Sequence, residues 1–336
     1  MTMLLPQFEL SLPKSVDEAI ALMAKFGPEN ADWLAGGSDL LCNYKWGLNT
    51  KPNVIGLGEV QELKSISPTR IGALTTLREI ATNEVLGKKL PCLPYVAKKI
   101  ASVLIQEQAT LGGNLMLDTR CHFFNQSYLW RRGLGYCLKA EGNLCHVIPK
   151  IKRDGVLVDN SFECVATNSS DFAPLLIALG AELEFASRAG SRRVKLADFY
   201  TYDGITRYHL EAGELLVAIH IPESAQTLKA GYKKLRPRES FDFPVLGVAA
   251  SLRKDSSGKL EHLSLCINAV HPHPHVFDEL CGKYLGSELT PESIDEIAAA
   301  VRKEINPKLN VPMEPGYRRK MSEVFVRRLL SELWAE

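Results

Sequence analysis

The pattern of apolar and polar residues along the first two-thirds of the chain switches repeatedly between helical and strand periodicity. Ser15-Val-Asp-Glu18 is a capping box, and it predicts an amphipathic helix that ends at Gly27. The run 32–35 predicts a strand that leads directly into a Gly-Gly pair. Further runs predict strands at 54–57, 70–74, 181–185 and 215–221, and helices at 76–81, 94–104 and 171–179.

The pattern changes beyond residue 227. Strand-like runs at 230–235, 245–253 and 260–270 come first, and predicted helices at 275–284, 291–305 and 318–334 follow. A sheet followed by helices is typical of an α+β unit, separate from the preceding part of the chain. The length of 336 residues also favours two or three domains. We therefore expect one domain over 1–224, in subdomains 1–60 and 61–224, and a second over 227–336.

Composition and charge narrow the range of functions. Hydrophobic residues make up 46% of the chain and charged residues 24%, which is ordinary for a globular protein. The net charge of +1 provides no global field for nucleic acid or an anionic membrane, and we expect neither as a partner. No apolar run approaches the ~20 residues of a membrane span, and the first residues lack the features of a signal peptide. The sequence predicts a cytoplasmic protein, in which clustered cysteines are more often ligands than disulfides.

Four of the eight cysteines fall in one segment, at Cys121, Cys137, Cys145 and Cys164. The intervals contain 15, 7 and 18 residues, so no C-x-x-C of a zinc ribbon or thioredoxin-type site is present. A long loop usually needs a functional reason to be ordered, and four thiolates around a [4Fe-4S] cluster would provide one. Structural zinc and four inert buried thiols are the alternatives. His122 or His146 could replace Cys164 as the fourth ligand.

Other candidate features are weaker. Cys42, Cys92, Cys266 and Cys281 lie singly in apolar runs, and we expect them in the core. Residues 120–153 contain seven basic residues and one acidic residue, which would form a solvated face, balance an anionic cluster or dock an acidic ferredoxin. The tract 271–275 reads His-Pro-His-Pro-His. It could bind a metal, but its prolines favour a turn whose alternate side chains splay apart.

Two Gly-Gly motifs lie about 75 residues apart, in Ala35-Gly-Gly-Ser-Asp-Leu40 and Thr110-Leu-Gly-Gly-Asn-Leu115. Because glycine lacks Cβ and tolerates positive φ, successive N–H groups in such turns can converge on phosphate oxygens. Ser38, Thr110 and Asn114 could add side-chain hydrogen bonds. Tight turns without a ligand are the alternative for either motif. The glycine fingerprints of Rossmann and P-loop nucleotide sites are absent.

Together with Ile71-Gly-Ala73, Ser170-Asp171-Phe-Ala-Pro174 and the run 241–250, these motifs resemble the FAD-binding subunits of molybdenum hydroxylases, the xanthine and CO dehydrogenase superfamily. The resemblance implies an α+β chain: a vanillyl-alcohol-oxidase-like (PCMH-type) FAD-binding domain in two subdomains, then a three-stranded sheet with helices. Gln106-Glu-Gln-Ala109 departs from the family pattern. The FAD contacts implied by the resemblance are Trp33, Leu34, Ala35, Gly36, Gly37, Ser38, Asp39, Leu40, Ala101, Thr110, Gly112, Gly113, Asn114, Asp171, Leu216 and Lys233.

The cysteines lie in an insertion of about 118–168, which most members of this superfamily lack. Asp118-Thr-Arg-Cys121, Phe123-Phe-Asn-Gln126, Gly135-Tyr-Cys-Leu-Lys139 and Cys145-His-Val147 make it similar to the β subunits of 4-hydroxybenzoyl-CoA reductases. That resemblance implies an electron-transfer subunit with FAD and one [4Fe-4S] cluster, and without catalytic residues of its own.

The same resemblance implies partners and a direction of electron flow. A molybdopterin-containing large subunit and a [2Fe-2S] small subunit would complete a dimer of heterotrimers. A ferredoxin-like donor would feed electrons through the [4Fe-4S] cluster and FAD toward molybdenum, for conversion of 4-hydroxybenzoyl-CoA to benzoyl-CoA in anaerobic aromatic degradation.

Three alternatives remain open from the sequence. The first is a flavin subunit of a xanthine-, aldehyde- or CO-dehydrogenase-like enzyme, passing electrons outward to NAD or a quinone. The second is a free-standing FAD oxidase, for which the C-terminal unit looks too small. The third is a zinc-binding scaffold without enzymatic function.

Overall fold

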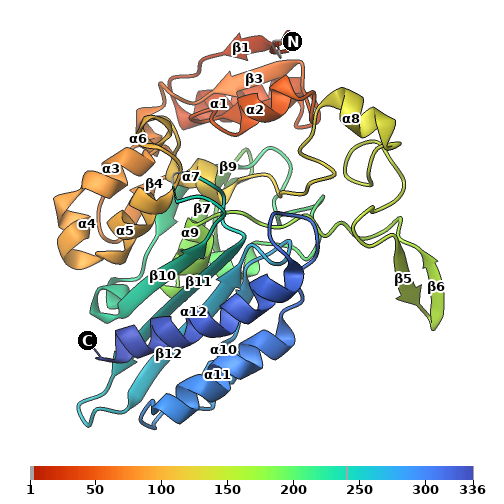
Figure 1. The fold of residues 1–336 in the computed structure, drawn as a ribbon. Helices are drawn as coiled ribbons and strands as arrows, with labels where there is room; N and C mark the ends of the chain where they lie inside the picture. The colour runs from red at the N-terminus through yellow and green to blue at the C-terminus, as the bar shows by residue number, and fades with distance from the viewer. Residues whose placement is uncertain (1–3, 240, 336) are drawn as a thin grey trace.

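The computed structural model describes residues 4–239 and 241–335. Its layers follow one another along the chain (Figure 1). A small N-terminal sheet lies at one end, a second sheet with several short helices lies in the middle, and a C-terminal sheet is covered by long helices. Within the described ranges, no helix is both long and apolar enough to cross a membrane.

The N-terminal layer is a parallel sheet in the order β1-β3-β2. Ser15 begins α1 by accepting a hydrogen bond from the Glu18 N–H at 3.1 Å, and Gly27, at φ 84°, ends it, as the capping box predicts. The elements of this layer are β1 (Glu9–Ser11), α1 (Val16–Phe26), β2 (Ala31–Leu34), α2 (Leu40–Lys45) and β3 (Asn53–Gly56).

The middle layer is an antiparallel sheet in the order β4-β9-β7-β8, and short helices pack beside it over a common apolar core. Thr76 and Glu79 form a reciprocal capping box at the start of α3. The elements are β4 (Arg70–Gly72), α3 (Leu77–Thr82), α4 (Glu84–Lys89), α5 (Cys92–Lys99), α6 (Val103–Gln106), α7 (Leu111–Leu115), α9 (Phe172–Ala178), β7 (Glu182–Ser187), β8 (Gly190–Lys195) and β9 (Leu215–His220), with the 3-10 turns η1 (Gln61–Leu63), η2 (Leu196–Asp198) and η3 (Glu223–Thr227).

The C-terminal layer is an antiparallel sheet in the order β10-β11-β12-β13. β11 is buried on both faces: Ala249 joins the core of the middle layer, whereas Val248 and Ala250 join the core beneath the helices. Accordingly, α9 packs on β11 and β12 while α12 packs on β10 and β11. The elements are β10 (Lys229–Leu235), β11 (Leu246–Lys254), β12 (Leu260–Asn268), β13 (His275–Val276), α10 (Asp278–Gly282), α11 (Pro291–Glu304) and α12 (Pro315–Ala335).

The insertion projects from one side of the molecule (Figure 1). It contains α8 (Tyr128–Gly133) and the hairpin β5 (Lys150–Arg153) and β6 (Val156–Asp159). An isolated bridge between Arg120 and Thr167 joins the two ends of the insertion. The insertion has a small apolar core of its own, formed with Leu48 and separate from the three larger cores.

The fold differs from the sequence prediction in several places. The C-terminal sheet has a fourth, two-residue strand at His275–Val276, where a helix was expected to begin. The predicted helix 94–104 is wrong at its end, because α5 stops at Lys99 and Ala101 takes a positive φ of 51°. The second Gly-Gly motif is the short helix α7, not a turn.

Candidate cofactor sites

The first Gly-Gly motif forms an open loop between β2 and α2. Gly37 has φ of 70°, and a Cβ added to Gly36 would lie 1.7 Å from the carbonyl oxygen of Gln108. Only glycine therefore lets this loop meet the segment before the second motif. Among the described residues, the backbone N–H groups of Gly36, Gly37 and Ser38 have no acceptor. These donors fit the phosphate oxygens of a dinucleotide.

The second motif has a different role. Its N–H groups are all engaged: Leu111 donates to Thr75, Gly112 to Ala73, and Gly113 to the Thr110 side chain at 3.0 Å. Thr110 also accepts from the Asn114 N–H through its carbonyl. These N–H groups are therefore already engaged within the protein, and contact of Thr110, Gly112 and Gly113 with FAD stays a prediction. The segment just before α7, at Gln108 and Ala109, lies against Gly36 of the first loop.

Several of the other predicted contacts are already bonded within the protein. The Asn114 side-chain oxygen accepts from the Ser170 hydroxyl at 2.7 Å and from the Phe172 N–H at 3.2 Å. The Trp33 indole donates to the Glu214 carbonyl at 2.9 Å. Leu216 is buried in the middle core. These residues shape the surroundings of the loop, and their direct contact with FAD stays a prediction.

Asp171 and Lys233 lie at the junction with the C-terminal sheet. Asp171 is fully buried and accepts from the Tyr232 hydroxyl at 2.7 Å and from the Lys234 amine at 2.9 Å. Burial raises the pKa of Asp171, opposed mainly by Lys234. Lys233 points to the surface and pairs with Glu332 of α12. A bond from Asp171 to the cofactor would have to compete with two contacts already made.

Arg120 connects the first Gly-Gly loop to the cysteine segment. Its guanidinium pairs with Asp39 of the loop and lies over the Phe243 ring, 4.5 Å from the centroid. Burial lowers its pKa to about 10, so it remains charged near neutral pH. Because Asp39 would repel a diphosphate, its neutralisation by Arg120 favours an anion at this loop. The sequence analysis did not single out this side chain, although Arg120 directly precedes Cys121.

The structure brings the four cysteines of the insertion together. Cys121, Cys137, Cys145 and Cys164 are all buried, and none forms a disulfide. Negative charge at any of the other three thiols would raise the pKa of Cys121, so Cys121 lies within electrostatic reach of each of them. The other cysteines are dispersed: Cys92, Cys266 and Cys281 are buried in the larger cores, whereas Cys42 is exposed, contrary to expectation.

Backbone N–H groups point at three of these sulfurs. Burial raises the pKa of Cys121 to about 12 and of Cys164 to about 11, and it also raises the pKa of Cys137. The N–H groups that oppose this rise are those of Phe123 at Cys121, Lys139 and Ala140 at Cys137, and Ala166 at Cys164. Burial of the sulfurs away from water, together with N–H donors directed at them, favours thiolates bound to an iron–sulfur cluster.

The histidine alternatives are less well placed. His146 is held by the Tyr136 carbonyl at 2.6 Å, and His122 is exposed. In residues 4–239 and 241–335, no three His, Cys, Asp or Glu side chains stand ready for a single metal ion. A [4Fe-4S] cluster makes a different demand, because each cysteine binds a different iron and the sulfurs remain apart.

A buried ion network supports the cysteine segment. Lys139, between Cys137 and Cys145 in sequence, donates to Asp118 at 2.5 Å and to the Gly204 carbonyl at 2.7 Å. Arg207 also pairs with Asp118, at 3.0 Å. Burial alone would raise the pKa of Asp118, but Lys139 and Arg207 lower it below its usual value. No sequence pattern indicates this network, because Arg207 is remote in the chain from Asp118 and Lys139.

The basic residues of the insertion do not form one positive face. Arg120, Arg131 and Lys139 point inward and hold backbone or carboxylate oxygens. The exposed hairpin carries Lys150, Lys152 and Arg153, but Asp154, Asp159 and Glu163 follow them. Charge therefore gives no support for an acidic ferredoxin at this surface.

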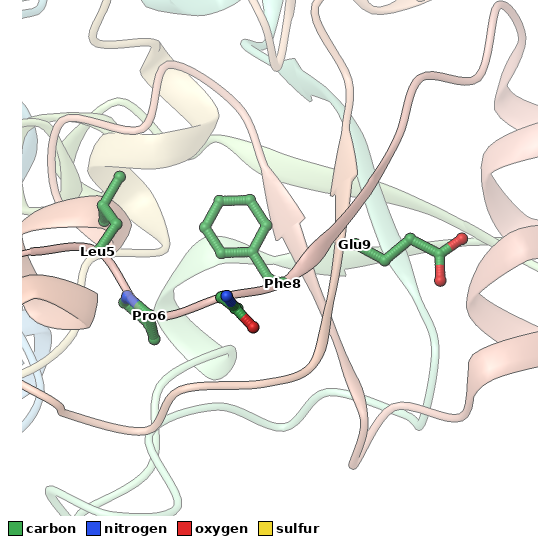
Figure 2. A pocket seen from close by; sticks show the side chains of 5 residues that line it. Leu5, Pro6, Phe8 and Glu9 are labelled. Atoms are coloured by element: carbon green, nitrogen blue, oxygen red, sulfur yellow. The ribbon is translucent and has the colours of Figure 1, made fainter.

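Two surface hollows lie away from the first Gly-Gly loop. One, of about 630 Å³, is formed by the N-terminal segment 5–9, with Phe8 pointing into it (Figure 2). The other, of about 150 Å³, lies between α5, β10 and α12. Basic side chains dominate its lining, which includes the predicted FAD contact Lys233 and also Tyr95, Lys99, Lys234, Arg236 and Phe325.

Comparison with known proteins accounts for both halves of the chain. Residues 6–224 match the family model of the FAD binding domain in molybdopterin dehydrogenase, and 230–333 match the CO dehydrogenase flavoprotein C-terminal domain. The aldehyde oxidoreductase FAD-binding subunit PaoB of Escherichia coli (strain K12) is 33% identical over 249 residues, which are 71% of this chain and 76% of that protein. The carbon monoxide dehydrogenase medium chain of Hydrogenophaga pseudoflava is 26% identical, covering 99% of each.

A solved structure agrees over the whole length. A chain of the reconstituted CO dehydrogenase from Oligotropha carboxidovorans superposes with a TM-score of 0.78 at 25% identity, covering 99% of each chain. The fold and the first Gly-Gly loop thus define a flavoprotein of the molybdenum hydroxylase class. The chain belongs to the FAD-binding (medium) subunits of the CO and xanthine dehydrogenase family, and its cofactor is FAD.

Proposed function

We propose that this chain is the electron-transfer subunit of a heteromeric molybdenum hydroxylase that oxidises its substrate and passes electrons outward. Its relatives are named as subunits of aldehyde, CO and xanthine enzymes, which supports oxidation better than reductive dehydroxylation. A large molybdopterin subunit and a small [2Fe-2S] subunit would be its partners. The observation that carries this proposal is the match of both domains, in order, to the medium chains of such complexes.

We further propose that the chain holds a [4Fe-4S] cluster through Cys121, Cys137, Cys145 and Cys164. The support is the burial of all four thiols, three of which, those of Cys121, Cys137 and Cys164, belong to one small core, with N–H groups directed at three of the sulfurs. FAD exchanges one or two electrons, and an adjacent cluster supplies a one-electron step. The protein's own part is to exclude water from the cysteines and to hold the first Gly-Gly loop beside them through Arg120.

Reductive dehydroxylation of 4-hydroxybenzoyl-CoA is the second candidate. The observation in its favour is the gathered cysteine insertion, which resembles that branch and would admit electrons from a one-electron donor. A direct assay of the assembled complex separates the two functions. Oxidation of an aldehyde, xanthine or CO with an electron acceptor supports the first, whereas benzoyl-CoA formation with reduced ferredoxin supports the second.

The cluster has its own test. We expect anaerobically purified chain to contain FAD and roughly four irons with matching acid-labile sulfide, and to give a cluster EPR signal after dithionite. Cys137→Ser should lose most of the iron, while Cys42→Ser, at an exposed cysteine, should retain it. FAD without iron in the wild type would refute the cluster and leave the flavin subunit intact. Absence of FAD would refute the flavin subunit, whatever the iron content.

A further inference from the structure

The turn after β12 gathers three imidazole rings in the C-terminal domain. The ring centroids of His271 and His273 lie 5.7 Å apart, those of His271 and His275 5.6 Å, and those of His273 and His275 5.8 Å. The expectation that the prolines splay these side chains apart is therefore wrong. Three imidazoles on one ion, with metal–nitrogen distances of ~2.1 Å, place their centroids roughly 5 Å apart. The rings are thus close to the required spacing.

One ring nitrogen of this cluster is buried and has no partner in the described part of the protein. Within the described residues, the buried Nδ1 of His273 has no hydrogen-bond partner. A buried polar nitrogen without a hydrogen-bond partner in the protein is energetically costly unless something else binds it.

A carboxylate orients the third ring. Glu304, the last residue of α11, contacts His275 Nε2 through Oε1 at 2.6 Å, which leaves Nδ1 of His275 for an ion. The charged groups that face the cluster are Glu304, Lys308 and Arg318. The guanidinium of Arg318 is fixed on the carbonyls of Val245, Lys308 and Ala269, so it cannot swing toward the rings. The positive charge of Lys308 disfavours a bound cation, and the negative charge of Glu304 offsets that effect.

We propose that His271, His273 and His275 bind one borderline divalent ion of the Zn²⁺ and Co²⁺ class, with Glu304 orienting His275. Imidazole is a preferred ligand of these ions. The described side chains do not yet stand at single-ion distances, so the ion must turn the rings about χ2, a torsion with broad wells in histidine. The bound ion would fix the β12–β13 turn against α11. This site is separate from the cysteines and does not depend on the proposed function.

Anaerobic titration of the full chain with Co²⁺ tests the proposal, because thiolate and imidazole sites differ in their spectra. Cysteine coordination gives a sulfur-to-cobalt charge-transfer band, whereas a histidine site gives ligand-field bands alone. We expect the Cys137→Ser chain to bind one equivalent of Co²⁺ with micromolar affinity and without the sulfur-to-cobalt band. Zn²⁺ should displace this Co²⁺. His273→Gln should weaken the binding of Co²⁺ at least tenfold, since even loss of an orienting neighbour costs that much. The control His209→Gln, at an exposed histidine, should leave it unchanged.

Co²⁺ binding without the sulfur-to-cobalt band that persists in His273→Gln, or that occurs only at millimolar Co²⁺, would overturn the proposal. If His273→Gln fails to fold, modification of the wild-type histidines by diethylpyrocarbonate replaces it. Zn²⁺ should then protect all three tract histidines and not His209, and equal reactivity with and without Zn²⁺ would refute the site.

Discussion

The missing side chain of Gly36 allows the first Gly-Gly loop to take the conformation seen in the structure. The absence of this side chain lets the loop touch the backbone of Gln108, and this contact joins two motifs that are far apart in sequence. The adjacent Gly37 provides the positive φ that turns the chain, and Arg120 neutralises the acid that follows. The loop that we propose binds the FAD phosphates therefore depends on the missing side chains of Gly36 and Gly37 and on the buried charge of Arg120.

Gly36→Ala is expected to abolish tight FAD binding. The added methyl group would lie 1.7 Å from a backbone oxygen, so the loop must move away, at a cost of about 1–3 kcal/mol in stability. A loss of FAD affinity of tenfold or more should follow, measured by quenching of flavin fluorescence on titration of the apoprotein. Gly58→Ala is the matched control, because a Cβ there meets nothing within 4 Å. Equal FAD affinity in the two variants would contradict this account of the loop.

At the scale of elements, the insertion is an independent small core mounted on the FAD domain. Its ends are joined by the Arg120–Thr167 bridge, and its interior is held by the buried Lys139–Asp118 pair. The side chains of this pair are 4% and 10% exposed, so each charge depends on the other. We therefore expect the arrangement of the cysteines to depend on this pair.

Lys139→Met should cost about 3 kcal/mol, because it leaves Asp118 buried with Arg207 as its remaining cation. Urea unfolding of the apoprotein measures the loss, and the iron content after reconstitution should fall in parallel. Lys152→Met, on the exposed strand β5, should change neither. A normal iron content in Lys139→Met would show that the pair does not support the cysteines.

The same network predicts how the insertion responds to acid. The pKa of Asp118 is lower in the folded protein than its ordinary value of 3.8, so its contribution is complete above that value. The contribution is lost as the pH falls through the folded pKa. Acid below about pH 4 should therefore loosen the insertion, and Asp118→Asn should remove this part of the pH dependence.

The elements that sequence reasoning found were those with local signals. Ser15 and Thr76 cap the helices that they were expected to begin, because a capping signal lies within four residues of the sequence. The hairpin β5–β6 and the strand β8 were missed, since their residues are mostly exposed and lack an apolar alternation. Likewise, the four cysteines were identified from spacing, but the Lys139–Asp118–Arg207 network was not, because it depends on contacts between distant segments.

At the scale of the whole molecule, one buried ion pair crosses between the two halves. Asp171 precedes α9 in the FAD domain, and Lys234 lies on β10 of the C-terminal sheet; their side chains are 2% and 4% exposed. Tyr232 adds a second bond from the same strand. Since α9 packs directly on this sheet, the pair fixes the two domains against each other. The neighbouring Lys233 instead makes a surface pair with Glu332.

Lys233 and Lys234 are adjacent in sequence, but only Lys234 forms a buried ion pair. Replacing each in turn therefore compares the contributions of a buried pair and a surface pair to stability. Lys234→Met should lower the free energy of unfolding by about 3 kcal/mol, because Asp171 stays buried without its cation. Lys233→Met should cost no more than about 1 kcal/mol, as is usual for an exposed pair. Calorimetry of the apoprotein measures both, and in Lys234→Met the separate cores should also begin to melt apart, broadening the transition. If the two variants lose equal stability, the domains are held by apolar packing between α9 and the sheet, and the buried pair contributes nothing of its own.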